Sequence, residues 1–143
     1  MAINEKNIIL KGKSSEEKLK VLEQLGDLIE EKYNWINPEK EFTYKVITTI
    51  VDAIIVENST DIQYEMFQTL YNWSWFPCSD EPYDKLLSYI DDITDPSSFI
   101  LLLRILIASG NLKYLDILKK YEKNKNIEVA KVAKEGIETL LNR

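Results

Sequence analysis

The chain has 143 residues, with 18 Lys or Arg against 24 Asp or Glu and a formal net charge of −6. A chain of this length is expected to form one domain over residues 1–143, with residues 1–13 as a loosely packed N-terminal segment, and to bury a core without disulfides or metal ions. Because it contains no histidine and a single cysteine, Cys78, the sequence excludes Ser-His-Asp and Cys-His catalysis, HExxH sites and zinc sites with four Cys or His ligands.

Neither the start of the chain nor its apolar segments indicate export or a membrane. The start, MAINEKNIIL, lacks the basic region and the long apolar stretch of a secretory signal. The longest nearly apolar run, residues 99–108, is interrupted by Arg104 and has about half the length that a membrane-spanning helix needs. A single cysteine permits no intramolecular disulfide. We therefore expect a cytoplasmic protein without a membrane-spanning segment.

The hydrophobic pattern predicts an all-α protein of about seven helices. Apolar residues recur at steps of three and four, and neither strict alternation nor an Asn-Gly or Asp-Gly turn is present. The first clear helix is expected to begin at Ser14, because Ser14 and Glu17 match a capping box. Its apolar stripe consists of Leu19, Leu22, Leu25, Ile29 and Tyr33.

The second helix is expected to begin at Asn37-Pro38-Glu39, which offers a capping residue, a proline for the first turn and an early acid. Many β-branched residues follow, so a strand over residues 46–56 is the competing interpretation. The spacing and the length of the apolar stripe favour a helix.

Two further helix starts are indicated by local signals. A third helix is expected after Ser59 and is expected to end where residues 71–76 run into Pro77. A short fourth helix with Leu86, Leu87 and Ile90 is expected to begin near Ser79 or Asp80.

The last three helices follow in the C-terminal third. The fifth is expected to begin at Asp95-Pro96 and to end at Gly110, a residue suited to a left-handed cap. The sixth is expected from Leu112, and the seventh after Asn126.

Polar helix starts recur at Asp61, Asp95 and Asn126, at spacings of 34 and 31 residues, which indicates stacked helical pairs. Residues 124–140 resemble the second half of a HEAT repeat, in which a polar turn precedes a helix with small residues for close packing. Residues 94–97 resemble the Asp-Pro turn of that family, although residues 101–103 depart from its pattern. From about residue 61 onward, the resemblance implies a short α-solenoid of HEAT-like pairs whose inner face binds a protein. An irregular helical bundle is the alternative.

Acidity is concentrated in the middle of the chain. Residues 37–98 contain 12 acidic and 3 basic residues, so this segment carries −9 and the rest carries +3. Such a field attracts basic proteins and repels nucleic-acid phosphates. A solvated acidic face that serves solubility is the alternative.

Aromatic and acidic residues lie together around Pro77, which is typical of an interface hot spot. The predicted partner-binding residues are Trp73, Trp75, Phe76, Asp80, Glu81, Tyr83 and Asp84. The alternative is that the aromatic residues fill the junction between two helical layers. Because Trp73 and Trp75 fall on different faces of a helix, we expect at least one of them in the core.

Signals for other chemistry are weaker. The acidic groups at residues 80–84 and 91–95 lack the spacing of a calcium loop, so we expect no metal and no cofactor. Cys78 has no neighbouring base to activate it. The basic concentration consists of Lys119, Lys120, Lys123, Lys125, Lys131 and Lys134. Acidic residues interrupt this group of lysines. The simpler interpretation is therefore that the lysines complement the ends of helices rather than bind nucleic acid.

We therefore expect a non-catalytic, cytoplasmic protein-binding module with a basic protein as its partner, and no enzyme. The short, acidic chain, rich in Lys, Asn and Ile, also resembles the immunity proteins that bacteria pair with secreted polymorphic toxins. This resemblance implies that the chain neutralises a cognate toxin. A HEAT-type protein that acts on nucleic acid and a structural adaptor in a larger assembly are the alternatives.

Overall fold

The computed structural model describes residues 8–143, and within this range the protein is all-α with no strand. The helices are α1 (Ser15–Glu31), α2 (Lys40–Val56), α3 (Thr60–Trp73), α4 (Glu81–Leu87), α5 (Pro96–Ser109), α6 (Leu115–Tyr121) and α7 (Ile127–Leu141). Two short 3-10 turns, η1 (Ile90–Asp92) and η2 (Leu112–Tyr114), precede α5 and α6. The prediction of about seven helices is confirmed for these residues, and the competing strand over residues 46–56 is wrong.

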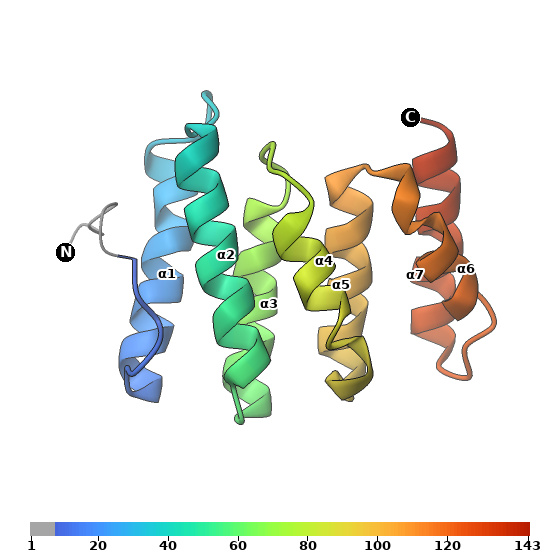
Figure 1. Cartoon of the computed structure of the whole chain (residues 1–143), viewed down its shortest axis with the longest axis horizontal. Coiled ribbons are helices and arrows are strands. Elements are labelled where there is room, and N and C mark those ends of the chain that lie inside the picture. Colours follow the sequence, from blue (N-terminus) through green and yellow to red (C-terminus); the bar gives the residue numbers. More distant parts are fainter. Residues whose placement is uncertain (1–7) are drawn as a thin grey trace.

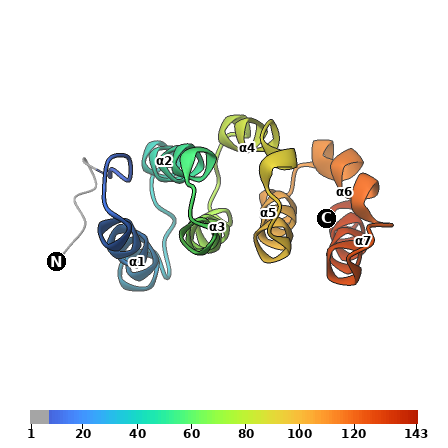
Figure 2. The same ribbon diagram turned by 90° about the horizontal axis from the view of Figure 1, so that it is seen from below.

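The helices lie in two layers. Seen from below, α1, α3, α5 and α7 form one row, and α2, α4 and α6 form the other (Figure 2). Consecutive helices run in opposite directions, up and down across the horizontal long axis of the molecule (Figure 1). All four helices of the first row therefore end at the same edge, at the top of Figure 1. We call this the upper edge; it comprises residues 32–39, 74–80, 110–114 and 142–143.

Four predicted N-terminal caps and one C-terminal cap are confirmed. The Ser14 side chain accepts from the Glu17 backbone amide within a complete capping box. The side chains of Ser59, Asp95 and Asn126 each accept from a backbone amide in the first turn of α3, α5 and α7. Gly110 ends α5 in the left-handed region at φ 73°, where a side chain is disfavoured.

Two predicted helix ends are wrong. The N-cap of α2 is Glu39 in extended backbone, so Asn37 is not the cap and Pro38, which is buried, stands before the helix. Helix α3 ends at Trp73 rather than at Pro77. Ser74 stops it, because its hydroxyl donates to the Tyr71 carbonyl at 2.6 Å and competes with the regular helix pattern.

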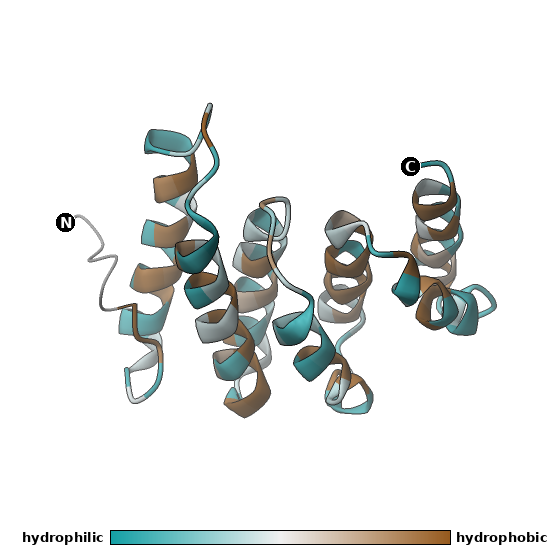
Figure 3. Cartoon of the chain, turned by 45° about the horizontal axis from the view of Figure 1, so that its top comes forward, coloured by the Kyte–Doolittle hydropathy of each residue, from teal (hydrophilic) through white to brown (hydrophobic). Residues whose placement is uncertain are grey.

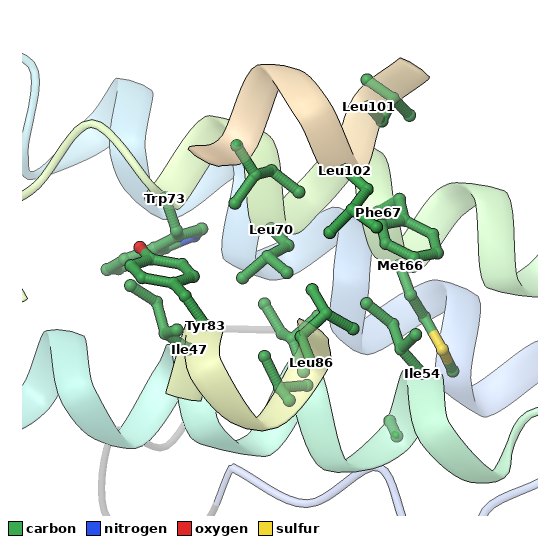
Figure 4. Packing of buried hydrophobic residues seen from close by; sticks show 14 of the residues in the cluster. Ile47, Ile54, Met66, Phe67, Leu70, Trp73, Tyr83, Leu86, Leu101 and Leu102 are labelled. Carbon is green, nitrogen blue, oxygen red and sulfur yellow. The ribbon is translucent and has the colours of Figure 1, made fainter. Parts of the chain in front are cut away.

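The core consists of two clusters. The larger one fills the space between the two layers from the N-terminal segment to α5, and Figure 4 shows part of it around Leu70, Leu86 and Leu102. The smaller one lies among α5, α6 and α7, with Leu103, Leu118 and Leu140 as its largest buried members. Phe99 packs against both. Helix α5 is therefore apolar over most of its length, whereas the exposed side of α4 is hydrophilic (Figure 3).

The start of the described chain belongs to the core. Ile8 and Leu10 are buried within the larger cluster, whereas Ile9 between them is exposed. Part of the segment expected to be loosely packed thus lies against the helices, and residues 1–7 of that segment lie outside the described residues. No helix between residues 8 and 143 is long and apolar enough to cross a membrane.

Candidate functional site

The upper edge exposes large apolar side chains. Trp35, in the connection between α1 and α2, is 93% exposed, and Trp75, directly after α3, is 56% exposed. Ile36 and Leu112 are also exposed along this edge. Exposed aliphatic residues are common on any surface, and others occur elsewhere on this chain, but tryptophan is normally well buried. The two exposed tryptophans therefore distinguish the upper edge from the rest of the described surface.

An aromatic cluster holds the two tryptophan-bearing connections together. It consists of Tyr33, Phe42, Trp73 and Phe76, whose ring centroids are 5.4–6.4 Å apart in edge or tilted arrangements. Its centre is Trp73, which is completely buried and donates its indole N–H to the Leu25 carbonyl of α1 at 3.1 Å. The cluster therefore fixes the positions from which Trp35 and Trp75 project.

The Trp75 ring contacts an aromatic residue of α3. It meets Tyr71 edge-on, with the ring centroids 5.8 Å apart. Trp75 also borders a cavity of about 350 Å³ whose walls include Phe76 from the same connection, Tyr83 from α4 and Ser109 from α5. We call this cavity the α3–α5 pocket; its lining is completed by Ser74, Pro77, Cys78 and Ala108.

The acidic side chains near Pro77 are partly engaged within the protein. Lys113 pairs with Asp84 at 2.8 Å and with Asp80 at 3.3 Å. Asp80 also accepts from the side-chain amide of Asn111 at 2.6 Å, and Asp84 accepts from the Tyr114 hydroxyl at 3.0 Å. These bonds join α4 to the connection between α5 and α6. The hydrogen bond to Asp84, followed by Asp80, raises the pKa of Lys113, so this cation stays charged beside the two carboxylates.

The seven predicted partner-binding residues thus fall into three groups. Trp73 and Tyr83 are 0% and 1% exposed, so neither side chain lies on the free surface. Asp80 and Asp84 are held by Lys113. Trp75 and Glu81 are exposed and Phe76 is half-buried. The prediction that one of Trp73 and Trp75 lies in the core is confirmed.

Sequence reasoning missed Trp35 and Ile36. Both lie in the connection between two helices, flanked by Asn34 and Asn37. An apolar pair within a polar connection is a signal that these side chains have no place in the core, and it was available from the sequence.

The C-terminal ends of four helices give the upper edge partial negative charge. Helices α1, α3, α5 and α7 all end there, and none has a basic residue in its last turn. Lys32 follows α1 directly, and Arg143 lies two residues after the end of α7. Because a helix C-terminus carries a partial negative charge that basic residues usually offset, the end of α3 favours a nearby cation, as does the end of α5, which Arg143 already approaches.

The acidic and thiol groups among the described residues are not arranged as metal ligands or as an activated nucleophile. Between residues 8 and 143, no three Cys, Asp or Glu side chains come together as metal ligands. Burial, followed by the nearby Asp80 carboxylate, raises the pKa of the Cys78 thiol. The thiol is therefore protonated near neutral pH and is a weak nucleophile.

Comparison of the chain with protein-family models, curated proteins and solved structures finds no match.

Proposed function

We propose that this chain is a non-catalytic protein-binding module that engages its partner with the upper edge. The observation that carries the proposal is the exposure of Trp35 and Trp75 on that one edge. A tryptophan in water forgoes a large hydrophobic stabilisation that a partner restores on binding, which is why tryptophan is enriched at interface hot spots. The aromatic cluster beneath them keeps the backbone in place, so little order has to be gained on association.

We further propose that the helices are HEAT-like pairs of a short α-solenoid. The two-layer order and the direction of the helices support this proposal (Figures 1 and 2). The close approach of α7 to its neighbours at Gly136 agrees with the small residues that the HEAT-like pattern contains. In such an arrangement the connections at one edge project side by side and offer a continuous strip to a partner.

A basic protein is the partner that the charges favour. The chain carries −6 overall and −9 over residues 37–98, and this segment contains Trp75. Around Trp35, the exposed acids Glu30, Glu31, Glu39 and Glu41 outnumber the exposed Lys32 and Lys40. A surface of this sign accelerates encounter with a basic protein and discriminates against acidic ones.

The most concrete form of the proposal is an immunity protein that neutralises a cognate bacterial toxin by covering its active site. The small size, the acidity and the resemblance of the C-terminal helices to HEAT repeats support it. A structural adaptor would use the same edge without rescuing cells from a toxin, and a nucleic-acid-acting protein would use the lysines of α6 and α7 instead.

The test is affinity capture from a lysate of the organism of origin with the tagged chain and two double variants. W35A/W75A removes the exposed tryptophans, and V56A/Y89A removes exposed apolar residues at the opposite edge. We expect the native chain and the control to retain one basic protein that W35A/W75A loses. Equal retention by all three chains would refute the upper edge as the binding surface. Circular dichroism checks that each variant is folded.

The captured protein then decides among the classes. Its expression in bacteria should arrest growth, and co-expression of the native chain, but not of W35A/W75A, should restore it. A captured protein that is harmless to cells would favour the adaptor. A shift of labelled DNA or RNA by the purified chain at low salt, lost on substitution of Lys131 and Lys134, would favour the nucleic-acid alternative.

A further inference from the structure

The α3–α5 pocket lies where α3 and α5 both end. Ser74 is the C-terminal cap of α3, and Ser109 is the last residue of α5. Both line the cavity of about 350 Å³ at the upper edge. Since neither helix has a basic residue in its last turn, two partial negative charges lie at the wall of the pocket without a cation from their own helices.

The hydroxyl groups of the pocket are predominantly acceptors. Ser74 donates to the Tyr71 carbonyl and Ser109 donates to the Leu106 carbonyl, each at 2.6 Å. Each hydroxyl has only one hydrogen, so both oxygens retain lone pairs and have no hydrogen left to offer. A ligand group that enters between them has to donate.

Tyr83 supplies a third polar group that lacks a partner. The residue is 1% exposed, yet its hydroxyl makes no hydrogen bond with any described residue. A buried hydroxyl without a partner is costly and normally has a functional or solvent partner. Burial, followed by the nearby Cys78 and Asp80, raises the pKa of Tyr83, so the phenol is neutral at physiological pH and can act as a hydrogen-bond acceptor. Its oxygen is itself buried, so a cation reaches it only if the side chains of the pocket wall move apart on binding.

The remaining wall is aromatic. Trp75 and Phe76 border the pocket, and the face of an aromatic ring attracts a cation. Arg143 gives an internal precedent, because its guanidinium group lies against Gly110, the residue after Ser109. The chain therefore already brings one cation to this end of α5, beside the pocket.

We infer that the α3–α5 pocket receives a lysine or arginine side chain of the protein partner, which Trp75, Tyr83 and Ser109 recognise through its charge and its N–H groups. This inference rests on the proposed function and specifies the anchor of the partner. It explains why a tryptophan is exposed beside a buried, unpartnered hydroxyl. One basic side chain would contact the tryptophan ring and donate a hydrogen bond to the hydroxyl.

The first test uses short peptides as probes. Blocked pentapeptides with a central Arg, Lys, citrulline or Glu are titrated into the ¹⁵N-labelled full chain, and the Trp75 indole and Ser109 amide signals are followed. Citrulline matches arginine in shape but carries no charge. We expect saturable shifts with the Arg and Lys peptides and affinities about tenfold weaker for citrulline. Equal shifts with Arg and citrulline, or none with any peptide, would overturn the inference.

The second test uses Y83F, which removes only the unpartnered oxygen. A hydroxyl with a purely structural role would cost stability when removed. We expect Y83F to melt at or above the temperature of the native chain, yet to bind the Arg peptide several-fold more weakly. Unchanged peptide affinity would exclude Tyr83 from recognition. R143A tests the neighbouring cation: stronger binding is expected if Arg143 competes for the pocket, and lost binding would show that the peptide signal depends on the terminus instead.

Failure of this inference is distinguishable from failure of the proposed function. If Y83F and the native chain retain the captured partner equally, whereas W35A/W75A loses it, the edge binds and the pocket does not anchor a cation. If no partner depends on Trp35 or Trp75, the proposed function fails whatever the peptides do.

Discussion

Gly136 lets α7 approach α5 and α6, and replacing it with alanine tests that packing directly. A Cβ atom at Gly136 would lie 2.7 Å from Ile107 Cγ1, closer still to Ile107 Cδ1, and 3.2 Å from Leu118 Cδ1. Carbon atoms do not pack this closely, so the Ile107 side chain has to move. Gly26, inside α1, is the matched control, because a Cβ atom there meets nothing within 4 Å.

Two opposing effects set the magnitudes. Gly→Ala inside a helix stabilises by about 1 kcal/mol, since glycine loses more backbone freedom on folding. Overpacking costs about 1–3 kcal/mol. We therefore expect G26A to gain about 1 kcal/mol, and G136A to be unchanged or to lose up to about 2 kcal/mol. The overpacking decides the sign only at Gly136.

Urea unfolding, followed by circular dichroism, measures both variants. The double variant G136A/I107A removes the obstructing atoms. The stability it loses should therefore be smaller, by about 1 kcal/mol or more, than the sum of the losses in the two single variants. An equal gain in G26A and G136A, with additive behaviour in the double variant, would refute the close packing of α7 on α5.

Three further predictions concern contacts between elements. Glu57 accepts a hydrogen bond from the Lys18 ammonium group at 2.8 Å. Burial by itself would raise the pKa of Glu57, but this bond and the bond from the Ser59 backbone amide lower it. The stability that ionised Glu57 contributes is therefore complete above the unfolded pKa near 4.5 and is lost as pH falls through the lower folded pKa. E57Q should cost about 1 kcal/mol at pH 7 and nothing in acid. A constant difference in free energy of unfolding between the native chain and E57Q, in urea titrations from pH 7 to pH 2, would contradict this. W73F removes the bond to the Leu25 carbonyl and part of a buried ring, so chemical denaturation should show a loss of about 2 kcal/mol, and an unchanged midpoint would exclude a packed Trp73. Y114F removes the 3.0 Å bond to a half-exposed carboxylate and should cost about 0.5–1.5 kcal/mol, whereas a loss equal to that of W73F would mean that the ring rather than the hydroxyl was disturbed.

The helix starts are predictable because their determinants are local. Ser14, Asp95 and Asn126 each cap a helix with atoms two or three residues away, so the pattern and the geometry coincide. Pro38 misleads because it is buried ahead of the helix rather than placed in the first turn, and burial is not recorded in the local signal. The end of α3 at Trp73 likewise depends on how Ser74 turns the chain, and proline three residues later is only an outer limit.

The candidate site is less predictable because its residues interact over long sequence distances. Asp84 is an ordinary exposed acid in the sequence, and only the fold brings Lys113, 29 residues later, within 2.8 Å. Trp73 and Trp75 look alike in composition, and the hydrogen bond to Leu25, 48 residues earlier, decides which one is core. The helical pattern separates the two tryptophans onto different faces, but it does not say which face is covered.

The division of the core into two clusters has a consequence for how the molecule opens. Helices α6 and α7 share the smaller cluster and rest on the remainder of the protein chiefly through α5, with Ile117 of α6 at the margin of the larger cluster. This pair can therefore detach while most of the interior shared by α1 to α4 stays buried. Amide hydrogens in α7 should then exchange with solvent by a partial opening that costs less than global unfolding, while those in α3 require the whole chain to unfold. Trp35 and Trp75 are anchored on the slowly exchanging part, so transient fraying of the C-terminal hairpin leaves both tryptophans in position.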